Sequence, residues 1–191
     1  MLKGRIMMSS TKKMVVSGLF VALALVLPTA FHAIPNAGRV MLPMHIPVLL
    51  CGFVCGPLFG LLCGIISPLL SSAITGMPPV AMLPSMMCEL AVYGLVSGLI
   101  FNKVKISNNP ARIYIALITA MLCGRFVNGV LNSLIFQAGS YSLQAWISAS
   151  FTVALPGIVT QLVAIPLVIV ALKRAKLIEY GDIAEAKKQG V

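Results

Sequence analysis

Charged side chains are scarce in this sequence of 191 residues, of which only 9% are charged and 59% are hydrophobic. Acidic residues are the rarest, with 4 Asp and Glu side chains in total. A soluble globular domain carries about a quarter charged residues, and a fold of this length has too little interior to hide so much apolar surface. The composition therefore excludes a water-soluble domain and indicates one membrane domain whose excess apolar surface faces hydrocarbon.

The signature motifs of several enzyme classes are also absent. The sequence has no GxxxxGK(S/T) phosphate-binding loop, no HExxH zinc motif and no GxSxG nucleophile motif. Its 5 cysteines all fall in apolar stretches, without a CxxC pair or a histidine at ligand spacing. These absences argue against an ATPase, a metal site and a bound cofactor, and they predict that the chain is not an enzyme.

The net charge of +10 does not indicate nucleic-acid binding, because the basic residues form short clusters between apolar runs rather than one solvated face. The first cluster lies within Met1–Lys13. The apolar run that follows it is longer than a typical signal-peptide core and has no obvious small-residue cleavage site. We expect that run to be a retained first helix.

Apolar runs bounded by charge, proline or turn residues divide the chain into Met14–Phe31, Ile46–Ile74, Met82–Phe101, Ile113–Phe136 and Ser148–Leu172. The second run is long for one membrane crossing of about 20 residues and short for two. Gly56-Pro57 interrupts it in the middle, where the proline disfavours a helical predecessor. The distribution of basic residues between the two sides of the membrane therefore has to decide the number of crossings.

A single crossing of this run would put the N-terminal and C-terminal basic clusters on opposite sides, against the positive-inside bias. A tight hairpin puts both termini and the basic loop Asn102–Ala111 in the cytoplasm, and leaves only Arg39 in an outer loop. We therefore predict an all-α bundle of six transmembrane helices with a short helix 2/helix 3 hairpin over residues 14–173. A cytoplasmic N-terminus (1–13) and tail (174–191) flank it, in a plasma membrane of bacterial type.

This topology places Cys55–Leu58 in an inner turn. The three outer loops are Ala33–Met44, Thr75–Ala81 and Gln137–Ala145. The first outer loop contains Pro35, Gly38 and Pro43, so it cannot be helical throughout. It is either a lid over a site beneath it or a plain surface connection. The short second crossing must either recruit Val40–His45 or be shielded from lipid by neighbouring helices.

Two ionisable residues lie deep inside predicted helices, where charge is costly and usually functional. Glu89 is roughly 10 Å from the outer end of its helix, and Arg125 is roughly 20 Å from the inner end of the next one. In a hydrocarbon core about 30 Å thick these depths coincide. The two side chains can form a structural ion pair between helices, or a pair that a ligand bridges.

Further hydrogen-bonding residues lie between this depth and the outer surface. Asn128 and Asn132 follow Arg125 on the same helical face. Others lie in the outer half or the middle of their helices: Ser67, Ser71, Ser72, Thr160 and Gln161. Each alone is typical of interhelical hydrogen bonding, but together with Glu89 and Arg125 they predict a pocket for a small polar solute loaded from outside. From this set we name Glu89, Arg125, Asn128, Asn132, Ser71 and Gln161 as candidate substrate-binding residues.

Small residues recur at four-residue spacing, at Gly52, Gly56, Gly60 and Gly64 and again at Gly18 with Ala22. Such faces allow backbones to approach closely, either inside the bundle or against another membrane subunit. For the Gly52–Gly64 ladder we favour internal packing.

The chain resembles the substrate-binding S components of energy-coupling factor (ECF) vitamin transporters over Met14–Leu172. The most similar stretches are HIPVLLCGFVCGP at 45–57 and SPLLSS at 67–72 leading to TGMPP at 75–79. The resemblance implies a six-helix subunit that captures a vitamin-like molecule outside the cell. A membrane-embedded T component and two ATPase subunits would supply the energy, in agreement with the missing phosphate-binding loop.

The resemblance also implies that a small-residue face on the first helix docks on the T component. The matching positions here are Gly18 and Ala22, where the family commonly has two alanines. It further implies that the loop between helices one and two closes over the ligand. Two other hypotheses remain, a self-contained permease and an assembly factor, although the sequence shows no convincing internal repeat of the kind many permeases have.

Overall fold

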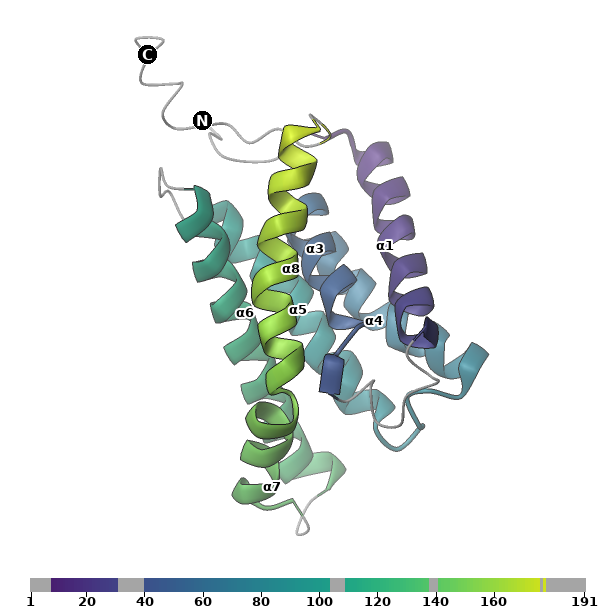
Figure 1. The fold of residues 1–191 in the computed structure, drawn as a ribbon. Coiled ribbons are helices and arrows are strands. Elements are labelled where there is room, and N and C mark those ends of the chain that lie inside the picture. The colour runs from purple at the N-terminus through teal and green to yellow at the C-terminus, as the bar shows by residue number, and fades with distance from the viewer. Residues whose placement is uncertain (1–7, 31–39, 104–108, 138–140, 176, 178–191) are drawn as a thin grey trace.

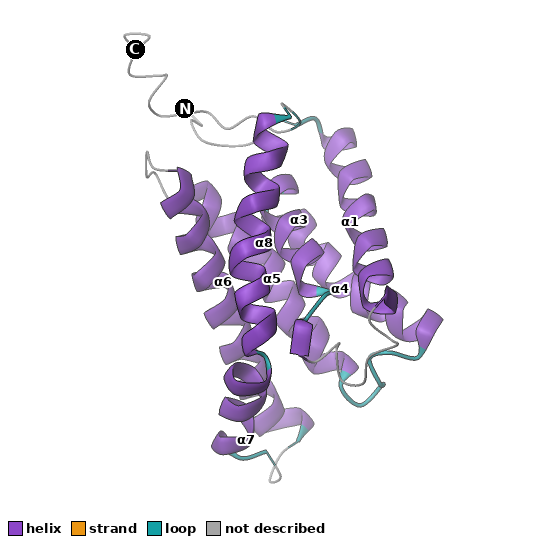
Figure 2. Cartoon of the chain, viewed as in Figure 1, coloured by secondary structure: helices purple, strands orange, loops and turns teal. Residues whose placement is uncertain are grey.

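The computed structural model describes residues 8–30, 40–103, 109–137, 141–175 and 177. These residues form helices and connecting loops, without a strand among them (Figure 2). The α-helices are α1 (Ser10–Ala30), α3 (His45–Cys55), α4 (Pro57–Thr75), α5 (Leu83–Lys103), α6 (Asn109–Leu131), α7 (Leu143–Ile147) and α8 (Leu155–Arg174). Two π-helical segments, Asn132–Phe136 and Ser148–Val153, continue α6 and α7. The all-α prediction is confirmed for this part of the chain.

Five helices in the described ranges are long and apolar enough to cross a membrane: α1, α4, α5, α6 with its π-helical end, and α8. The sixth predicted span corresponds to α3, which has 11 residues and is therefore only about 17 Å long. By length alone α3 does not cross a hydrocarbon core of about 30 Å. The described residues thus form a multi-pass helical membrane bundle with five full-length candidate spans and the short buried helix α3.

Shielding by neighbouring helices, rather than extension, accommodates the short α3. Ten of its 11 residues are buried, so its backbone and side chains contact protein instead of lipid. Val40 and Met41 are helical, but Leu42 has a positive φ of 50° and α3 begins only at His45. The segment before His45 is therefore not recruited into the helix. Pro47 is tolerated because the first turn of a helix does not need that backbone N–H.

The predicted break at Gly56-Pro57 is confirmed as the turn between α3 and α4. Gly56 has a φ of 98°, a backbone conformation that favours glycine, and Pro57 opens α4. A cavity beside this turn is lined by residues of the start of α1 and the end of α5, including Lys13 and Asn102. The turn, the start of α1 and the end of α5 therefore lie at the same end of the bundle.

Most of the basic residues of the helices gather at that end. Arg112 near the start of α6 donates from Nε to the Phe101 carbonyl at the end of α5, at 2.7 Å. Figure 1 shows the start of α1 and the end of α8, with Lys173 and Arg174, at this same end. We call it the basic end, and the opposite end, where α4 ends and α5 begins, the distal end. The arrangement has the charge asymmetry on which the sequence-based topology rests.

Glycines allow α3, α4 and α5 to pack backbone against backbone. A β-carbon at Gly60 would overlap the Gly94 carbonyl, and one at Gly64 would overlap the Leu90 carbonyl. Gly52 likewise faces Gly94 and the Ser97 hydroxyl. The favoured interpretation of the glycine ladder as internal packing is therefore confirmed at these three positions, whereas the fourth, Gly56, forms the turn.

Candidate functional site

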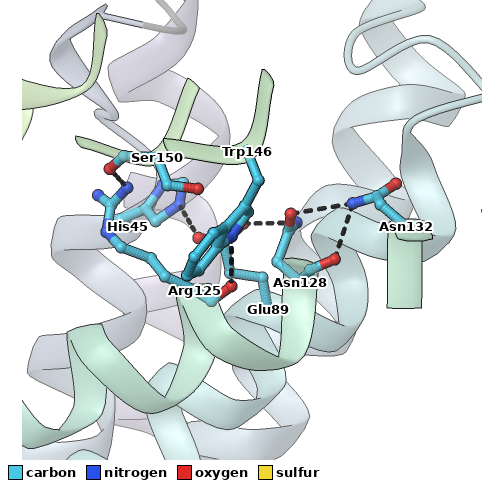
Figure 3. Close-up of polar contacts among 7 residues, drawn as sticks. All are labelled: His45, Glu89, Arg125, Asn128, Asn132, Trp146 and Ser150. Atoms are coloured by element: carbon cyan, nitrogen blue, oxygen red, sulfur yellow. Dashed lines mark hydrogen bonds and ion pairs between the residues drawn. The ribbon is translucent and has the colours of Figure 1, made fainter. Parts of the chain in front are cut away.

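A buried polar cluster joins α5 and α6 toward the distal end of the bundle (Figure 3). Glu89 of α5 accepts a hydrogen bond at Oε2 from the Asn128 side-chain amide of α6, at 2.9 Å. The Glu89 side chain is 14% exposed, so this carboxylate lies largely out of solvent within an otherwise apolar bundle. A buried carboxylate is costly unless polar neighbours satisfy it, and Asn128 provides one of them.

Amide groups extend the cluster from Glu89 toward the distal end. The Asn132 amide donates to both the backbone carbonyl and the side-chain oxygen of Asn128, each at 2.9 Å. Gln137 in turn donates to the Asn132 side-chain oxygen at 3.2 Å. Asn132 is buried and begins the π-helical end of α6. The predicted polar stripe along α6 therefore exists as a connected hydrogen-bonded row.

His45, the first residue of α3, completes the cluster from a third helix. Its Nε2 lies 4.0 Å from Glu89 Oε1, and its ring packs edge-on against Tyr93 with centroids 5.3 Å apart. Because α3 is short, its amino end lies at the depth of Glu89, where the positive end of the helix dipole favours a carboxylate. Sequence reasoning did not include His45 among the candidate substrate-binding residues. The available signal was its position at the start of an apolar run too short to cross the membrane.

Arg125 lies in the same cluster, buried to 4% exposure. One terminal nitrogen, Nη1, donates to the Ser150 carbonyl of the π-helical segment after α7. The Phe151 ring lies beside the guanidinium, with its centroid 5.7 Å from Cζ. The segment between α6 and α8 thus covers Arg125 and fixes the direction of its side chain.

Trp146 of α7 connects the segment that covers Arg125 to α6. Its indole Nε1 donates to the Arg125 carbonyl at 3.1 Å, and its ring packs so tightly on Gly129 that a β-carbon there would lie 2.5 Å from Nε1. Trp146 also lines a groove of about 330 Å³ between α6 and α7. Trp146 therefore borders the groove and also contacts a residue of the polar cluster. Sequence reasoning placed Ser150 and Phe151 in the run of the last helix and Trp146 between that run and the outer loop before it, and it gave none of the three a role in the site.

Glu89 and Arg125 share the cluster but do not contact each other directly. Among the described residues, the Glu89 carboxylate has His45 within 4.0 Å and no ion pair with Arg125. Each side chain is held by a different partner, Glu89 by Asn128 and Arg125 by Ser150. Of the two alternatives left by the sequence, a direct ion pair is therefore not formed.

The remaining candidate binding residues lie on α4 and α8. Ser71 of α4 donates to the carbonyl of Met77, in the connection between α4 and α5, at 2.7 Å. Gln161 of α8 is fully buried, and neither polar atom of its side chain has a hydrogen-bond partner among the described residues. Ser71 thus has a local structural partner, whereas Gln161 has unused hydrogen-bonding capacity.

Gly18 and Ala22 are exposed on the outward face of α1. A β-carbon at Gly18 would meet no atom within 4 Å. Only Phe20 and Ala24 of this helix are buried. This small-residue face therefore does not serve packing within the described chain, in contrast to the glycines of α3 and α4.

The first outer loop falls mostly on residues 31–39, outside the described residues, so its prediction as a lid stays open. The described end of that segment packs on α8, since a β-carbon at Gly157 would lie 2.7 Å from the Val40 carbonyl oxygen. This contact brings the chain before α3 against the distal half of α8.

Comparison with known proteins gives a family for the chain but no curated relative. No curated protein matches it. The family of the ECF transporter, substrate-specific component, matches residues 12–172, which include every described helix residue of the membrane bundle except the first two of α1 and the last two of α8. With its apolar helices, the match makes this a membrane transport subunit rather than an enzyme. The chain belongs to the family of substrate-specific components of ECF transporters.

Proposed function

We propose that this chain is the substrate-capture subunit of an ATP-driven importer for a vitamin or related small micronutrient. The observation that supports this most is the buried cluster of Glu89, Asn128, Asn132 and Arg125. Ionisable groups are expensive inside a membrane, and they are retained mainly where they act on a solute or a proton. A cluster at the distal end, covered by α7 and its π-helical extension, suits a small polar solute entering from that end.

In this proposal the cluster residues recognise different parts of the solute. Glu89 accepts a hydrogen bond from a hydroxyl or ammonium group of the substrate, and Asn128 and Asn132 position that carboxylate. Gln161 adds a donor and an acceptor, because its amide is buried without a partner among the described residues. Ser71 contributes only as an acceptor, since its hydrogen is already donated to Met77.

We propose that the basic end faces the cytoplasm of the cell, with segments 1–13 and 174–191 on that side of the plasma membrane. Lys173 and Arg174 in the last turn of α8 and Lys103 in that of α5 support this orientation. With the native cysteines replaced, the Arg174→Cys variant should react with a membrane-impermeant maleimide only after permeabilisation. The Ser142→Cys variant should react in intact cells, and the reverse pattern would invert the topology.

The partners in this proposal are a membrane-embedded T component and two ATPase subunits. The face formed by Gly18 and Ala22 is exposed and lined by small side chains, which suits close approach of a helix from another membrane subunit. We therefore assign docking of the T component to this face of α1.

Ala22→Trp should abolish most co-purification with the T component and ATPases while leaving small-molecule binding by the isolated chain unchanged. The indole would fill the space that a partner backbone needs, but it would touch no buried part of this chain. Affinity purification from native membranes with quantitative mass spectrometry measures the recovery. Leu58→Trp, at an exposed position on α4, serves as the matched control and should retain the complex.

The same purification tests the proposed function as a whole. The wild-type chain should bring down a larger membrane protein with two nucleotide-binding subunits, and these should hydrolyse ATP. Recovery of full complex with Ala22→Trp would reject the docking face. Uptake of a solute into vesicles that contain the chain alone, without ATPases, would contradict the capture-subunit proposal in favour of a permease.

A further inference from the structure

The Arg125 guanidinium is only partly used within the described chain. Nη1 donates to the Ser150 carbonyl, whereas Nε and Nη2 are buried and have no hydrogen-bond partner among the described residues. A buried donor without a partner carries a desolvation penalty that native proteins rarely leave uncompensated. Two such donors on one fixed side chain therefore point to a missing acceptor.

The two unused nitrogens form a single edge of the guanidinium. The Nε–H and one Nη2–H bond point in parallel, a fork that matches the two oxygens of one anionic group. The Ser150 carbonyl holds Nη1, and the Phe151 ring lies beside the guanidinium. The free edge is thus presented in a fixed direction before any ligand arrives, which lowers the entropy cost of binding.

Charge in the cluster limits what can bind at this edge. Figure 3 shows three ionisable side chains in the cluster, those of His45, Glu89 and Arg125. Glu89 is hydrogen-bonded by Asn128 rather than by Arg125. Arg125 supplies one positive charge. A phosphate monoester would bring about 1.5 to 2 negative charges, and with Glu89 nearby it would leave more uncompensated negative charge in this buried site than a carboxylate would. A carboxylate brings a single charge and a planar pair of oxygens.

We propose that the substrate of this chain carries a carboxylate group and that Arg125 binds it bidentately through Nε and Nη2. This inference rests on the proposed capture function and specifies the chemical class of its substrate. The neighbouring Glu89 then disfavours a second negative charge and selects a monoanion with a hydroxyl or ammonium group within reach.

The test uses the full-length chain purified in nanodiscs and dialysed to equilibrium against a small-molecule extract of its own cells. Compounds enriched beside the protein, relative to empty nanodiscs, are identified by mass and then methyl-esterified. Esterification adds the mass of one methyl group for each carboxylate in a compound, whereas a phosphate is recognised by its characteristic fragment ions. The enriched compound is finally titrated as the free acid and as its methyl ester.

We expect an enriched carboxylic acid whose methyl ester binds at least about 100-fold more weakly, because the ester loses its charge and its symmetric pair of acceptors. Arg125→Gln should weaken the free acid by a similar factor, and Arg125→Lys by at least about 10-fold, since lysine keeps the charge but loses the fork. In Arg125→Gln the difference between acid and ester should largely disappear, which a merely structural role would not produce.

Arg112→Gln provides the matched control, because Arg112 is equally buried but lies at the basic end. It should leave the preference for acid over ester unchanged, and thermal unfolding checks that each variant is folded. An enriched compound without a carboxylate, or an acid whose ester binds equally well, would overturn this inference and leave the capture function intact. Enrichment of no compound at all would instead contradict the capture function itself.

Discussion

Gly94→Val should lower the free energy of unfolding of the isolated chain by about 3 kcal/mol or more, since overpacking a tight interface costs about 1–3 kcal/mol and more where the surroundings cannot move. A β-carbon at Gly94 would lie 2.9 Å from the Gly60 Cα and closer still to its carbonyl. The obstacle is backbone, so a change of side-chain rotamer cannot relieve it. The two helices α4 and α5 would have to separate.

Unfolding of the purified protein in detergent, followed by circular dichroism against temperature, measures this loss. Gly18→Val is the matched control, because it makes the same substitution in a helix where a β-carbon meets nothing within 4 Å. The control should unfold within about 0.5 kcal/mol of the wild type, as exposed substitutions usually do. Equal stability of Gly94→Val and Gly18→Val would contradict the packing described for α4 and α5.

Asn128→Leu should weaken both the fold and solute capture. The Asn128 amide donates to Glu89 and its side-chain oxygen accepts from Asn132, so leucine leaves a buried carboxylate and a second amide without these partners. Removing one partner of a buried charged group costs about 2–3 kcal/mol. Affinity of the folded fraction should fall at least about 30-fold, because Glu89 is no longer held toward the substrate.

Ser133→Ala is the matched control, and it shows whether any substitution in this region lowers stability and solute affinity. Ser133 is exposed on the neighbouring π-helical segment and donates only to the Val130 carbonyl, so its loss should change neither quantity appreciably. Isothermal titration with the compound enriched by the wild type, alongside thermal unfolding, measures both quantities. If Asn128→Leu lowered stability but left the affinity of the folded fraction unchanged, the amide would be structural and the assigned site would be wrong.

The helices were predictable where one-dimensional patterns determine them. The apolar runs gave α1, α5 and α6 with its π-helical end to within about four residues, and they gave the end of α8 but not its start, which is Leu155 rather than Ser148. Gly56-Pro57 gave the turn between α3 and α4 because few other residue pairs satisfy that backbone. The length of α3 was less certain, since burial by neighbours permits a helix too short to span. Its start at His45 is one residue from the start of the predicted apolar run at Ile46, whereas its burial depends on packing that no local pattern specifies.

The depth of the candidate site in the membrane was predictable from the sequence, but the contacts between its residues were not. Counting residues placed Glu89 and Arg125 at one level, because helices rise regularly along the membrane normal. Whether they touch depends on helix rotation and on competing partners, and Ser150 and Asn128 hold them separately. Ser150 lies in a segment expected to be part of the last helix, and Trp146 lies in the interruption before it. Contacts made by such irregular backbone have no sequence period to reveal them.

The most direct test of the central claim is an experimental structure of the chain saturated with the compound that it enriches from its own cell extract. We predict density for that compound in contact with the Arg125 guanidinium and the Glu89 carboxylate, beneath Trp146. Density confined to the groove between α6 and α7, lined by Phe126, Tyr141 and Leu143, would contradict the assigned site while retaining a binding function. A bound structure with the polar cluster unchanged and empty of ligand would show that Glu89 and Arg125 serve the fold alone.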